Sequence, residues 1–378
     1  DRLGRSIENV ASIRPPHHGK DLQASIDLRL QYLAYRTLKS AIKTHNARSG
    51  SIVVLDVRTG EVLAMVNQPT YNPNDRSQFS AERYRNRAIT DIFEPGSSLK
   101  PLVVAAAIES GQYRPSSIVD TAPGFVVVGP KKIEDPRNLG RVSLTTILAR
   151  SSNVGITKLA MTLQADQLWD TMSQFGLGKL TTSGFPGESA GMLTHFSNWR
   201  PISQATLAYG YGVSVTPLQL AQAYALIGDG GSMHPISLVA LDQPVDGEQV
   251  IGEDTAAAVR RMLEEVVRPG GTGTKAAVDG YRIAGKTGTA WKFATGGYSQ
   301  DKYISIFAGM APASDPRLAT VVVIDEPSGE LYYGSDVAAP VFADVMSESL
   351  RLLAVPPDAM PARDAGNVMQ AMATPAES

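Results

Sequence analysis

The segment Phe93-Glu94-Pro95-Gly96-Ser97-Ser98-Leu99-Lys100-Pro101 carries a serine and a lysine three positions apart. Proline has no backbone N–H and is tolerated in a helix only within the first turn, so Pro101 predicts a helix that begins near Ser97. That start places the Ser97 hydroxyl at the positive end of the helix dipole, among backbone N–H groups without helical partners. Lys100 falls on the same helical face, within reach of Ser97. A serine nucleophile needs a nearby base, and Lys100 can serve if burial or a second cation lowers its pKa.

Two further motifs follow in chain order. Ser151-Ser152-Asn153 interrupts an apolar helical stretch, and we interpret it as a short loop that presents its first and third residues to a cleft; a plain helix cap is the alternative. Lys286-Thr287-Gly288-Thr289 stands in a strand-like run, where a glycine often marks close approach of a ligand or another backbone. Lys286 is the candidate second cation. The ordered set S-x-x-K, S-x-N and K-T-G is typical of serine acyltransferases that penicillin inhibits.

Each pattern alone is loose and has other matches in the chain. Ser40-Ala41-Ile42-Lys43 also has the form S-x-x-K, but it lies inside a predicted amphipathic helix and is interpreted as solvated surface. Arg48-Ser49-Gly50 and Arg58-Thr59-Gly60 imitate the third motif with arginine and are more simply turns. Order and context therefore separate the three motifs from these matches.

A nucleotide-binding interpretation also has support in the sequence. The stretch from Gly280 to Thr287 satisfies G-x-x-x-x-G-K-T, and the run from Val321 to Glu326 resembles a Walker B strand, which leaves a P-loop ATPase as a remote alternative. A phosphate loop must leave a strand and open a helix. Before Gly280, only the short stretch from Ala276 to Asp279 could provide the strand, and no run of helix formers follows the motif. The context therefore disfavours a phosphate loop.

Composition limits the possible partners and cofactors. The 378 residues have a formal net charge of -2, which gives no electrostatic reason to expect nucleic acid as a partner. Cysteine is absent, which fits an oxidising compartment. The five histidines, at positions 17, 18, 45, 195 and 234, show no metal-ligand spacing, and we predict no metal and no cofactor. The sequence shows neither a run of about 18 apolar residues nor a signal-peptide pattern. If the protein works outside the cytoplasm, we therefore expect a further segment upstream of this sequence.

Hydrophobic periodicity predicts one mixed α/β domain. Strands are expected near both ends of the chain, at 51–57, 61–66, 281–292, 303–310 and 318–325. Helices are expected at 27–43, 102–110, 144–163, 218–227 and 338–353. We therefore expect a sheet assembled from both ends of the sequence, with the middle of the chain forming a helical lobe against it.

Beyond the three motifs, the sequence contains Phe185-Pro186-Gly187-Glu188 and a run from Tyr209 to Gly212 that leads to Val215-Thr216-Pro217. Together these residues resemble the transpeptidase domain of class B penicillin-binding proteins, and most of all the septal members that act in cell division. The resemblance extends over most of the chain. It implies the fold that these transpeptidases share with serine β-lactamases, which has a central antiparallel sheet and a helical lobe.

The resemblance also implies how the chain is divided. Residues 25–354 would form the transpeptidase domain, residues 1–24 the end of a preceding pedestal domain, and residues 355–378 a tail that we expect to be disordered. In the family, a membrane anchor and the rest of the pedestal come first. The resemblance therefore implies a place at the periplasmic face of the bacterial inner membrane, with proteins of the division machinery as partners.

By the same resemblance, four residues would carry the chemistry. Ser97 would be the acylated nucleophile and Lys100 the group that accepts its proton. Ser151 and Lys286 would pass the proton to the leaving amine. The implied reaction attacks the penultimate D-alanine carbonyl of a peptidoglycan stem peptide, releases the terminal D-alanine and transfers the acyl group to an amine on a neighbouring strand, with β-lactams as covalent inhibitors.

Other motif residues would bind the substrate. Asn153 would hydrogen-bond the substrate's peptide amide, and Thr287, Gly288 and Thr289 would form the binding strand, with the two threonines on the substrate carboxylate. The backbone N–H groups of Ser97 and Thr289 would form the oxyanion hole. Two alternatives share the fold. A serine β-lactamase would need a base for hydrolytic water, which the sequence does not identify, and a β-lactam sensor would be joined to a signalling segment, which the chain does not show.

Overall fold

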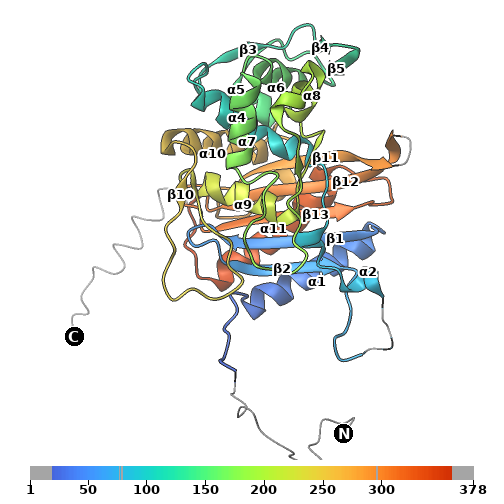
Figure 1. Cartoon of the computed structure of the whole chain (residues 1–378), viewed down its shortest axis with the longest axis vertical. Coiled ribbons are helices and arrows are strands. Elements are labelled where there is room, and N and C mark those ends of the chain that lie inside the picture. The colour runs from blue at the N-terminus through green and yellow to red at the C-terminus, as the bar shows by residue number, and fades with distance from the viewer. Residues whose placement is uncertain (1–18, 76, 78–79, 295–296, 360–378) are drawn as a thin grey trace, which may run out of the picture.

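The computed structural model describes residues 19–359 apart from 76, 78, 79, 295 and 296. Within that part, a five-stranded sheet has the order β11-β12-β13-β1-β2, and all of its neighbouring strands are antiparallel (Figure 1). Its strands are β1 Ser49–Asp56, β2 Val62–Gln68, β11 Ala284–Ala294, β12 Gly297–Ala311 and β13 Leu318–Asp325. The expected mixed α/β class and the joining of both chain ends in one sheet are confirmed.

The inner strand β1, between β13 and β2, is buried along its whole length because layers of helices cover both faces of the sheet. Successive side chains of a strand point to opposite faces. Val53 and Leu55 accordingly belong to the core on the side of the lobe, whereas Ile52 and Val54 belong to the core on the other side. This double burial explains why the strand reads as a continuous apolar run.

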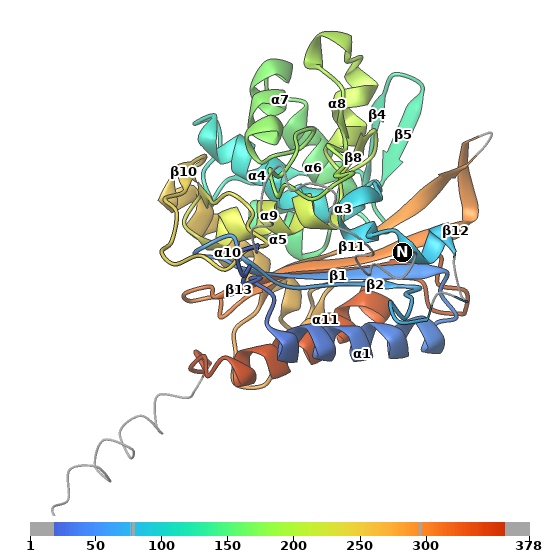
Figure 2. The same ribbon diagram turned by 60° about the horizontal axis from the view of Figure 1, so that its bottom comes forward.

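Two long helices cover the face away from the lobe. They are α1, Leu28–Thr44, and α11, Gly334–Leu352, which lie together beneath the sheet in Figure 2. The Asp27 carboxylate caps α1 by accepting the backbone N–H of Arg29 at 2.9 Å. Helix α11 begins four residues before the expected start at Ala338.

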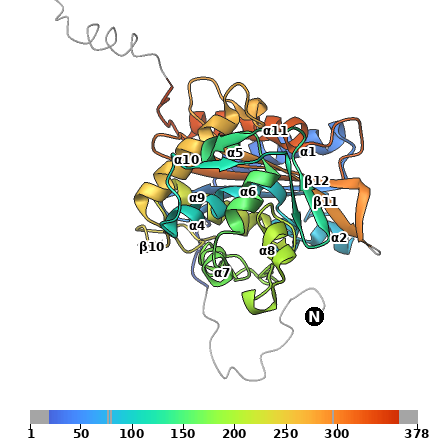
Figure 3. The same ribbon diagram turned by 90° about the horizontal axis from the view of Figure 1, so that it is seen from above.

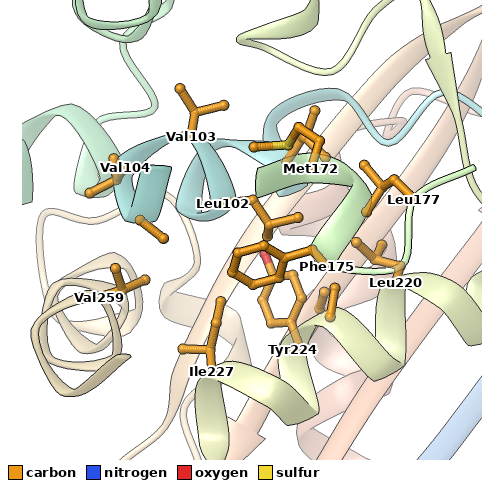
Figure 4. Packing of buried hydrophobic residues seen from close by; sticks show 14 of the residues in the cluster. Leu102, Val103, Val104, Met172, Phe175, Leu177, Leu220, Tyr224, Ile227 and Val259 are labelled. Carbon is orange, nitrogen blue, oxygen red and sulfur yellow. The ribbon is translucent and has the colours of Figure 1, made fainter. Parts of the chain in front are cut away.

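The opposite face carries the helical lobe, seen from above in Figure 3. Its helices are α4 Lys100–Glu109, α5 Leu144–Ala149, α6 Asn153–Ala160, α7 Ala165–Gln174, α8 Pro201–Leu207, α9 Pro217–Gly228 and α10 Glu253–Val267. Helix α9 is buried along its whole length, because it lies between the sheet and the rest of the lobe. Figure 4 shows its Tyr224 beside Phe175 and beside Leu102 of α4, in the core that supports the start of α4.

Short elements complete the fold. The helical ones are α2 Ala81–Tyr84, α3 Arg87–Thr90 and the 3₁₀ turns Gly96–Leu99, Phe196–Asn198 and Thr274–Ala276. The paired strands are β3 Ile118–Asp120 with β6 Arg141–Ser143, β4 Phe125–Val128 with β5 Lys131–Glu134, β7 Met192–Leu193 with β8 Val213–Ser214, and β9 Ser232–Met233 with β10 Glu248–Gln249. No helix among the described residues has the length and apolar character needed to cross a bilayer.

The helical stretch expected at 144–163 divides into α5 and α6 at residues 150–152, where the sequence also predicts a short loop. One expectation about the end of the chain is corrected. The tail is not disordered from its start, because the Asp358 carboxylate accepts the backbone N–H groups of Arg282 at 2.7 Å and Ser314 at 3.0 Å. Residues 360–378 of the predicted tail and residues 1–18 of the predicted pedestal remnant lie outside the described residues.

Candidate active site

Ser97 lies in the 3₁₀ turn that leads directly into α4, as Pro101 predicts. Gly96 makes the turn possible with a φ of 52°, a conformation that suits glycine. The Gly96 N–H donates to the carbonyl oxygen of Gly210 at 3.1 Å, which fixes the turn against the 209–212 loop. Ser97 itself is half-buried and lines a cleft.

The next residue anchors this turn from behind. Ser98 is fully buried, and its hydroxyl donates to the carbonyl oxygen of Pro95 at 2.6 Å. The hydroxyl of Tyr224 on α9 donates to the carbonyl oxygen of Ser98 at 2.8 Å. The segment that carries Ser97 is therefore held by the buried core shown in Figure 4 rather than by surface contacts.

Lys100 is fully buried at the start of α4. Its Nζ donates to the carbonyl oxygen of Ser151 at 2.6 Å, to the Ser151 hydroxyl at 3.1 Å and to Asn153 Oδ1 at 2.8 Å. Burial, reinforced by the positive charge of Lys286, lowers the pKa of Lys100 well below its ordinary value, while Asp135 acts in the opposite direction. The sequence-based expectation of a lysine with a depressed pKa, helped by a second cation, agrees with this arrangement.

The turn that joins α5 to α6 presents the second motif. Ser151 has a φ of 56°, and Asn153 is the first residue of α6, so both side chains reach Lys100. Ser152 between them is the N-cap, and its hydroxyl accepts the N–H of Gly155 at 2.8 Å. The motif is thus both a helix cap, through Ser152, and a presenting loop, through its two neighbours.

Asp135 holds this turn in place, and sequence reasoning did not identify it. Its carboxylate accepts the backbone N–H groups of Asn153 at 2.6 Å and Val154 at 3.1 Å, and the hydroxyl of Ser152 also donates to it. A carboxylate at the start of a helix also complements the helix dipole. No motif surrounds Asp135 in the sequence, because its role depends on contacts made across the turn.

The third motif lies on β11, an edge strand of the sheet. A Cβ on Gly288 would lie 2.9 Å from the carbonyl oxygen of Pro95, so only glycine lets β11 approach the Ser97 segment this closely. Lys286 is fully buried, and burial lowers its pKa to about 7. The Nζ of Lys286 donates to the carbonyl oxygen of Thr287 at 3.2 Å.

The two threonines of the motif differ in their surroundings. Thr287 is buried, and its hydroxyl pairs with the hydroxyl of Thr272 at 3.0 Å. Thr289 is half-buried, and its hydroxyl accepts the backbone N–H of Gly334, the first residue of α11, at 2.9 Å. Because a hydroxyl that accepts one bond still has a proton to donate, Thr289 can bind an anion in the cleft.

The motifs meet at one cleft of about 450 Å³. Ser97, Asn153 and Thr289 line it, whereas Lys100 and Lys286 lie buried behind its wall. Sequence reasoning missed the rest of its lining, which consists of the β5 residues Lys131, Lys132, Ile133 and Glu134 and the aromatic residues Tyr209, Tyr211, Trp291, Tyr298, Tyr303, Tyr332 and Tyr333. Two parts of this lining offered a signal in the sequence: the run from Tyr209 to Gly212, which carries part of the family resemblance, and the adjacent aromatic pair Tyr332-Tyr333.

Other interpretations of these residues do not fit the geometry. Lys286, the lysine of the G-x-x-x-x-G-K-T match, is buried within β11, and no helix follows it, so the nucleotide-binding alternative is wrong. Among the described residues, no group of three or more histidines, aspartates or glutamates is placed to hold a metal ion.

The fold and the cleft together define the class of the penicillin-interacting serine proteins. A sequence model of the family described as penicillin binding protein transpeptidase domain matches residues 50–347. This chain belongs to that family. The match covers almost the whole five-stranded sheet and most of α11, so the three motifs lie inside it.

The relatives support the same assignment. The chain is 47% identical over 364 residues to the peptidoglycan D,D-transpeptidase FtsI of Escherichia coli K12, which covers 96% of this chain and 61% of that protein. It is 42% identical over 359 residues to the probable peptidoglycan D,D-transpeptidase PenA of Neisseria meningitidis, covering 94% and 61% respectively. The chain therefore spans 61% of the length of these curated relatives.

A solved structure agrees with the fold. The apo transpeptidase domain of penicillin-binding protein 3 from Burkholderia pseudomallei is 41% identical to this chain and superposes with a TM-score of 0.83. The match covers 90% of this chain and 98% of that domain. The expected fold of a central antiparallel sheet with a helical lobe is confirmed.

Proposed function

We propose that this chain is a peptidoglycan D,D-transpeptidase domain that works through an acyl-enzyme on Ser97. The observation that carries the proposal is the buried amine of Lys100. It has a depressed pKa and bonds to Ser151 and Asn153, one helical turn from a serine that lines the cleft. The similarity to named D,D-transpeptidases supports the reaction type.

Acylation begins when Ser97 Oγ attacks the penultimate D-alanine carbonyl carbon of the donor peptide. The hydroxyl proton passes to the neutral amine of Lys100, and the carbonyl becomes a tetrahedral oxyanion. The backbone N–H groups of Ser97 and Thr289 are proposed to stabilise that oxyanion, a contribution typically worth about 10²- to 10³-fold in rate per donor.

Collapse of the intermediate breaks the carbon–nitrogen bond and releases the terminal D-alanine. Its leaving nitrogen takes the proton back through Ser151, which contacts Lys100 directly, with Lys286 supplying charge to the relay. Asn153 is proposed to bind the peptide amide, and Thr287 and Thr289 on either side of Gly288 the terminal carboxylate. An acceptor amine then attacks the ester, which regenerates the Ser97 hydroxyl.

The described residues that line the cleft offer no free carboxylate to activate water, which favours transfer of the acyl group to an amine over hydrolysis. Among the described residues that line the cleft, the carboxylate-bearing one is Glu134, and it is ion-paired with Lys132 at the exposed surface. A serine β-lactamase requires a carboxylate or equivalent base free to activate water beside the acyl-enzyme. The proposal therefore includes slow deacylation and stable acylation by β-lactam antibiotics.

The proposal extends to the cellular setting through the resemblance to septal class B proteins. We place the domain at the periplasmic face of the inner membrane, anchored by a segment outside this sequence, with division-machinery proteins as partners. Its substrates would be a stem peptide ending in D-Ala-D-Ala and an amine on a neighbouring strand.

Intact-protein mass spectrometry after brief exposure to benzylpenicillin tests the proposal. Wild type should gain one intact drug mass, Ser97→Ala should gain none, and Ser40→Ala, which alters another S-x-x-K match, should behave as wild type. Release of D-alanine from a donor peptide by the wild type then separates a transpeptidase from a sensor. Unmodified protein with the drug intact would refute the proposal, and drug consumed without an adduct would point to a β-lactamase.

A further inference from the structure

One wall of the cleft carries a cation that the proposed acyl transfer does not use. The hairpin β4–β5 stands on the lobe side of the sheet, above β11 and β12 in Figure 2. Its strand β5 lines the cleft together with Tyr209, Tyr211 and Tyr298. The first two residues of β5 are lysines, and successive side chains of a strand point to opposite faces, so Lys131 and Lys132 have different surroundings.

Lys132 belongs to the outer face of the hairpin. It forms an ion pair with Glu134 on the same strand, and its Nζ lies 4.5 Å from the ring centroid of Phe125. Phe125, opposite Glu134 across the hairpin, and Val127, opposite Lys132, are both exposed. The charge of Lys132 is therefore compensated on the solvent side.

Lys131 belongs to the inner face, with Ile133, which is 4% exposed. Its Nζ lies 5.9 Å from the ring centroid of the buried Tyr209, within the range of a cation–π contact. Across the described ranges of the chain, Lys131 forms no ion pair. Its positive charge reaches the segment that carries Ser97, because it partly offsets the rise that burial causes in the pKa of Glu94.

The hairpin also has a fixed position relative to the site. Asp135, directly after β5, accepts hydrogen bonds from the backbone of Asn153 and Val154. Lys131 lines the same cleft as Ser97, Asn153 and Thr289. A peptide whose scissile carbonyl sits at Ser97 can thus place its upstream residues beside Lys131.

We propose that Lys131 is a specificity-determining residue that binds a side-chain or α-carboxylate of the donor peptide upstream of its D-Ala-D-Ala end. The proposal rests on the proposed function and deepens it, because it makes the preferred donor an anionic peptide rather than its amidated form. An ammonium group that forms no direct ion pair within the described residues is suited to such a carboxylate. The aromatic rings that share the cleft would pack against the apolar parts of the peptide.

The test compares two soluble pentapeptides that end in D-Ala-D-Ala and differ in one group, a free or an amidated carboxylate upstream. Each peptide competes with a fluorescent penicillin for acylation of the whole chain, and the concentration that halves the acylation rate reports its affinity. Lys131→Met keeps the length of the side chain but removes its charge. Lys39→Met is the matched control, because Lys39 is also exposed and its Nζ lies 5.7 Å from the ring centroid of Tyr35, on α1 and away from the cleft.

For the acidic peptide, Lys131→Met should raise the concentration that halves the acylation rate about tenfold, which corresponds to the loss of one charge-assisted hydrogen bond. The amidated peptide should be unaffected, Lys131→Arg should restore the preference, and Lys39→Met should behave as wild type. High salt should reduce the difference in affinity between the acidic and the amidated peptide, because Lys131 is exposed and its charge is screened.

Equal effects of Lys131→Met and Lys39→Met, or an equal loss for both peptides, would overturn the role of Lys131. Neither result would affect the proposed function, which stands or falls on acylation of the wild type by the fluorescent penicillin alone. Because the control acylation is measured in every variant, a variant that fails to fold is recognised directly, and Lys131→Arg then provides the comparison through its preference between the two peptides.

Discussion

Gly210 and Gly96 meet backbone to backbone. The Gly96 N–H donates to the Gly210 carbonyl oxygen at 3.1 Å, and a Cβ on Gly210 would lie 2.1 Å from the Gly96 carbonyl oxygen. Gly210 also has a φ of 84°. A loop far away in the sequence thus determines where the residue before Ser97 lies, and no side chain fits between the two segments.

We expect Gly210→Ala to reduce the second-order rate constant of penicillin acylation by about 10²-fold, because small displacements of a nucleophile are costly. Gly187→Ala is the matched control, since Gly187 has a similar φ of 79° but a Cβ placed there would have no other atom within 4 Å. Stopped-flow acylation with a fluorescent penicillin provides the measurement. Equal losses in the two variants would show that backbone strain, not displacement of the nucleophile, causes the effect.

Replacing the buried amine should separate catalysis from folding. We expect Lys100→Met to lower the acylation rate constant by at least about 10³-fold, since it removes the group that takes the Ser97 proton. Because methionine is similar in length and buries no charge, the circular dichroism spectrum should stay native. Lys43→Met, in the S-x-x-K match on α1, serves as the control. Acylation at the wild-type rate in Lys100→Met would exclude Lys100 as the base.

The pH profile should report the coupling between the two buried lysines. Acylation requires neutral Lys100, so its rate should fall as the pH falls through the depressed pKa of that amine. The charge of Lys286 contributes to that depression. Lys286→Met should therefore raise the pKa of Lys100 and move the acidic limb of the profile to higher pH, besides lowering the maximum rate.

Lys292→Met is the control for this shift. Lys292 lies on the same strand, but it is paired with Asp325 and Glu326 rather than facing Lys100. Its acidic limb should coincide with that of the wild type in acylation rates recorded from acid to mildly alkaline pH. A limb at an unchanged pH in Lys286→Met would contradict electrostatic coupling between the lysines.

Asp135 should stabilise the turn that carries Ser151. The Asp135 carboxylate accepts two backbone N–H groups and the Ser152 hydroxyl. Asp135→Asn leaves one accepting oxygen and places an NH₂ group, itself a donor, against one of these donors. We expect a loss of about 1–3 kcal/mol in the free energy of unfolding and an acylation slower by about tenfold, roughly the cost of leaving a buried donor unpaired. Glu134→Gln, one residue earlier and exposed, should change neither quantity in denaturant titrations and acylation assays.

Much of the architecture was predictable because it follows from local patterns. The runs at 51–57 and 318–325 are apolar enough to indicate buried strands, and Pro101 indicates the start of α4. The break at residues 150–152 was predictable from its polar residues. The start of α11 was not predictable, because Gly334 is required by a contact with a residue distant in the sequence. A Cβ on Gly334 would lie 2.3 Å from the carbonyl oxygen of Gly288.

The site likewise contains residues that could be predicted from the sequence and residues that could not. The ordered motifs identified the residues that the structure brings together around the cleft, since their types and spacing are distinctive. The supporting residues carry no such pattern. Tyr224 is one apolar residue among many on α9, and its hydrogen bond to Ser98 joins positions 126 residues apart. Asp135 and Lys131 acquire their roles only when the hairpin β4–β5 lies against α6.

The position of strand β1 between β2 and β13 has consequences for biosynthesis. Its residues Ser49–Asp56 emerge early, yet their partners on β13, Leu318–Asp325, are made some 260 residues later, roughly 10 to 50 s at ribosomal speeds. Until then β1 has one open edge, and β11, which closes the cleft behind Ser97, is also late. A nascent or prematurely terminated chain therefore possesses the serine without β11 and β13. Under the proposed function, only molecules translated almost to the end would react with penicillin.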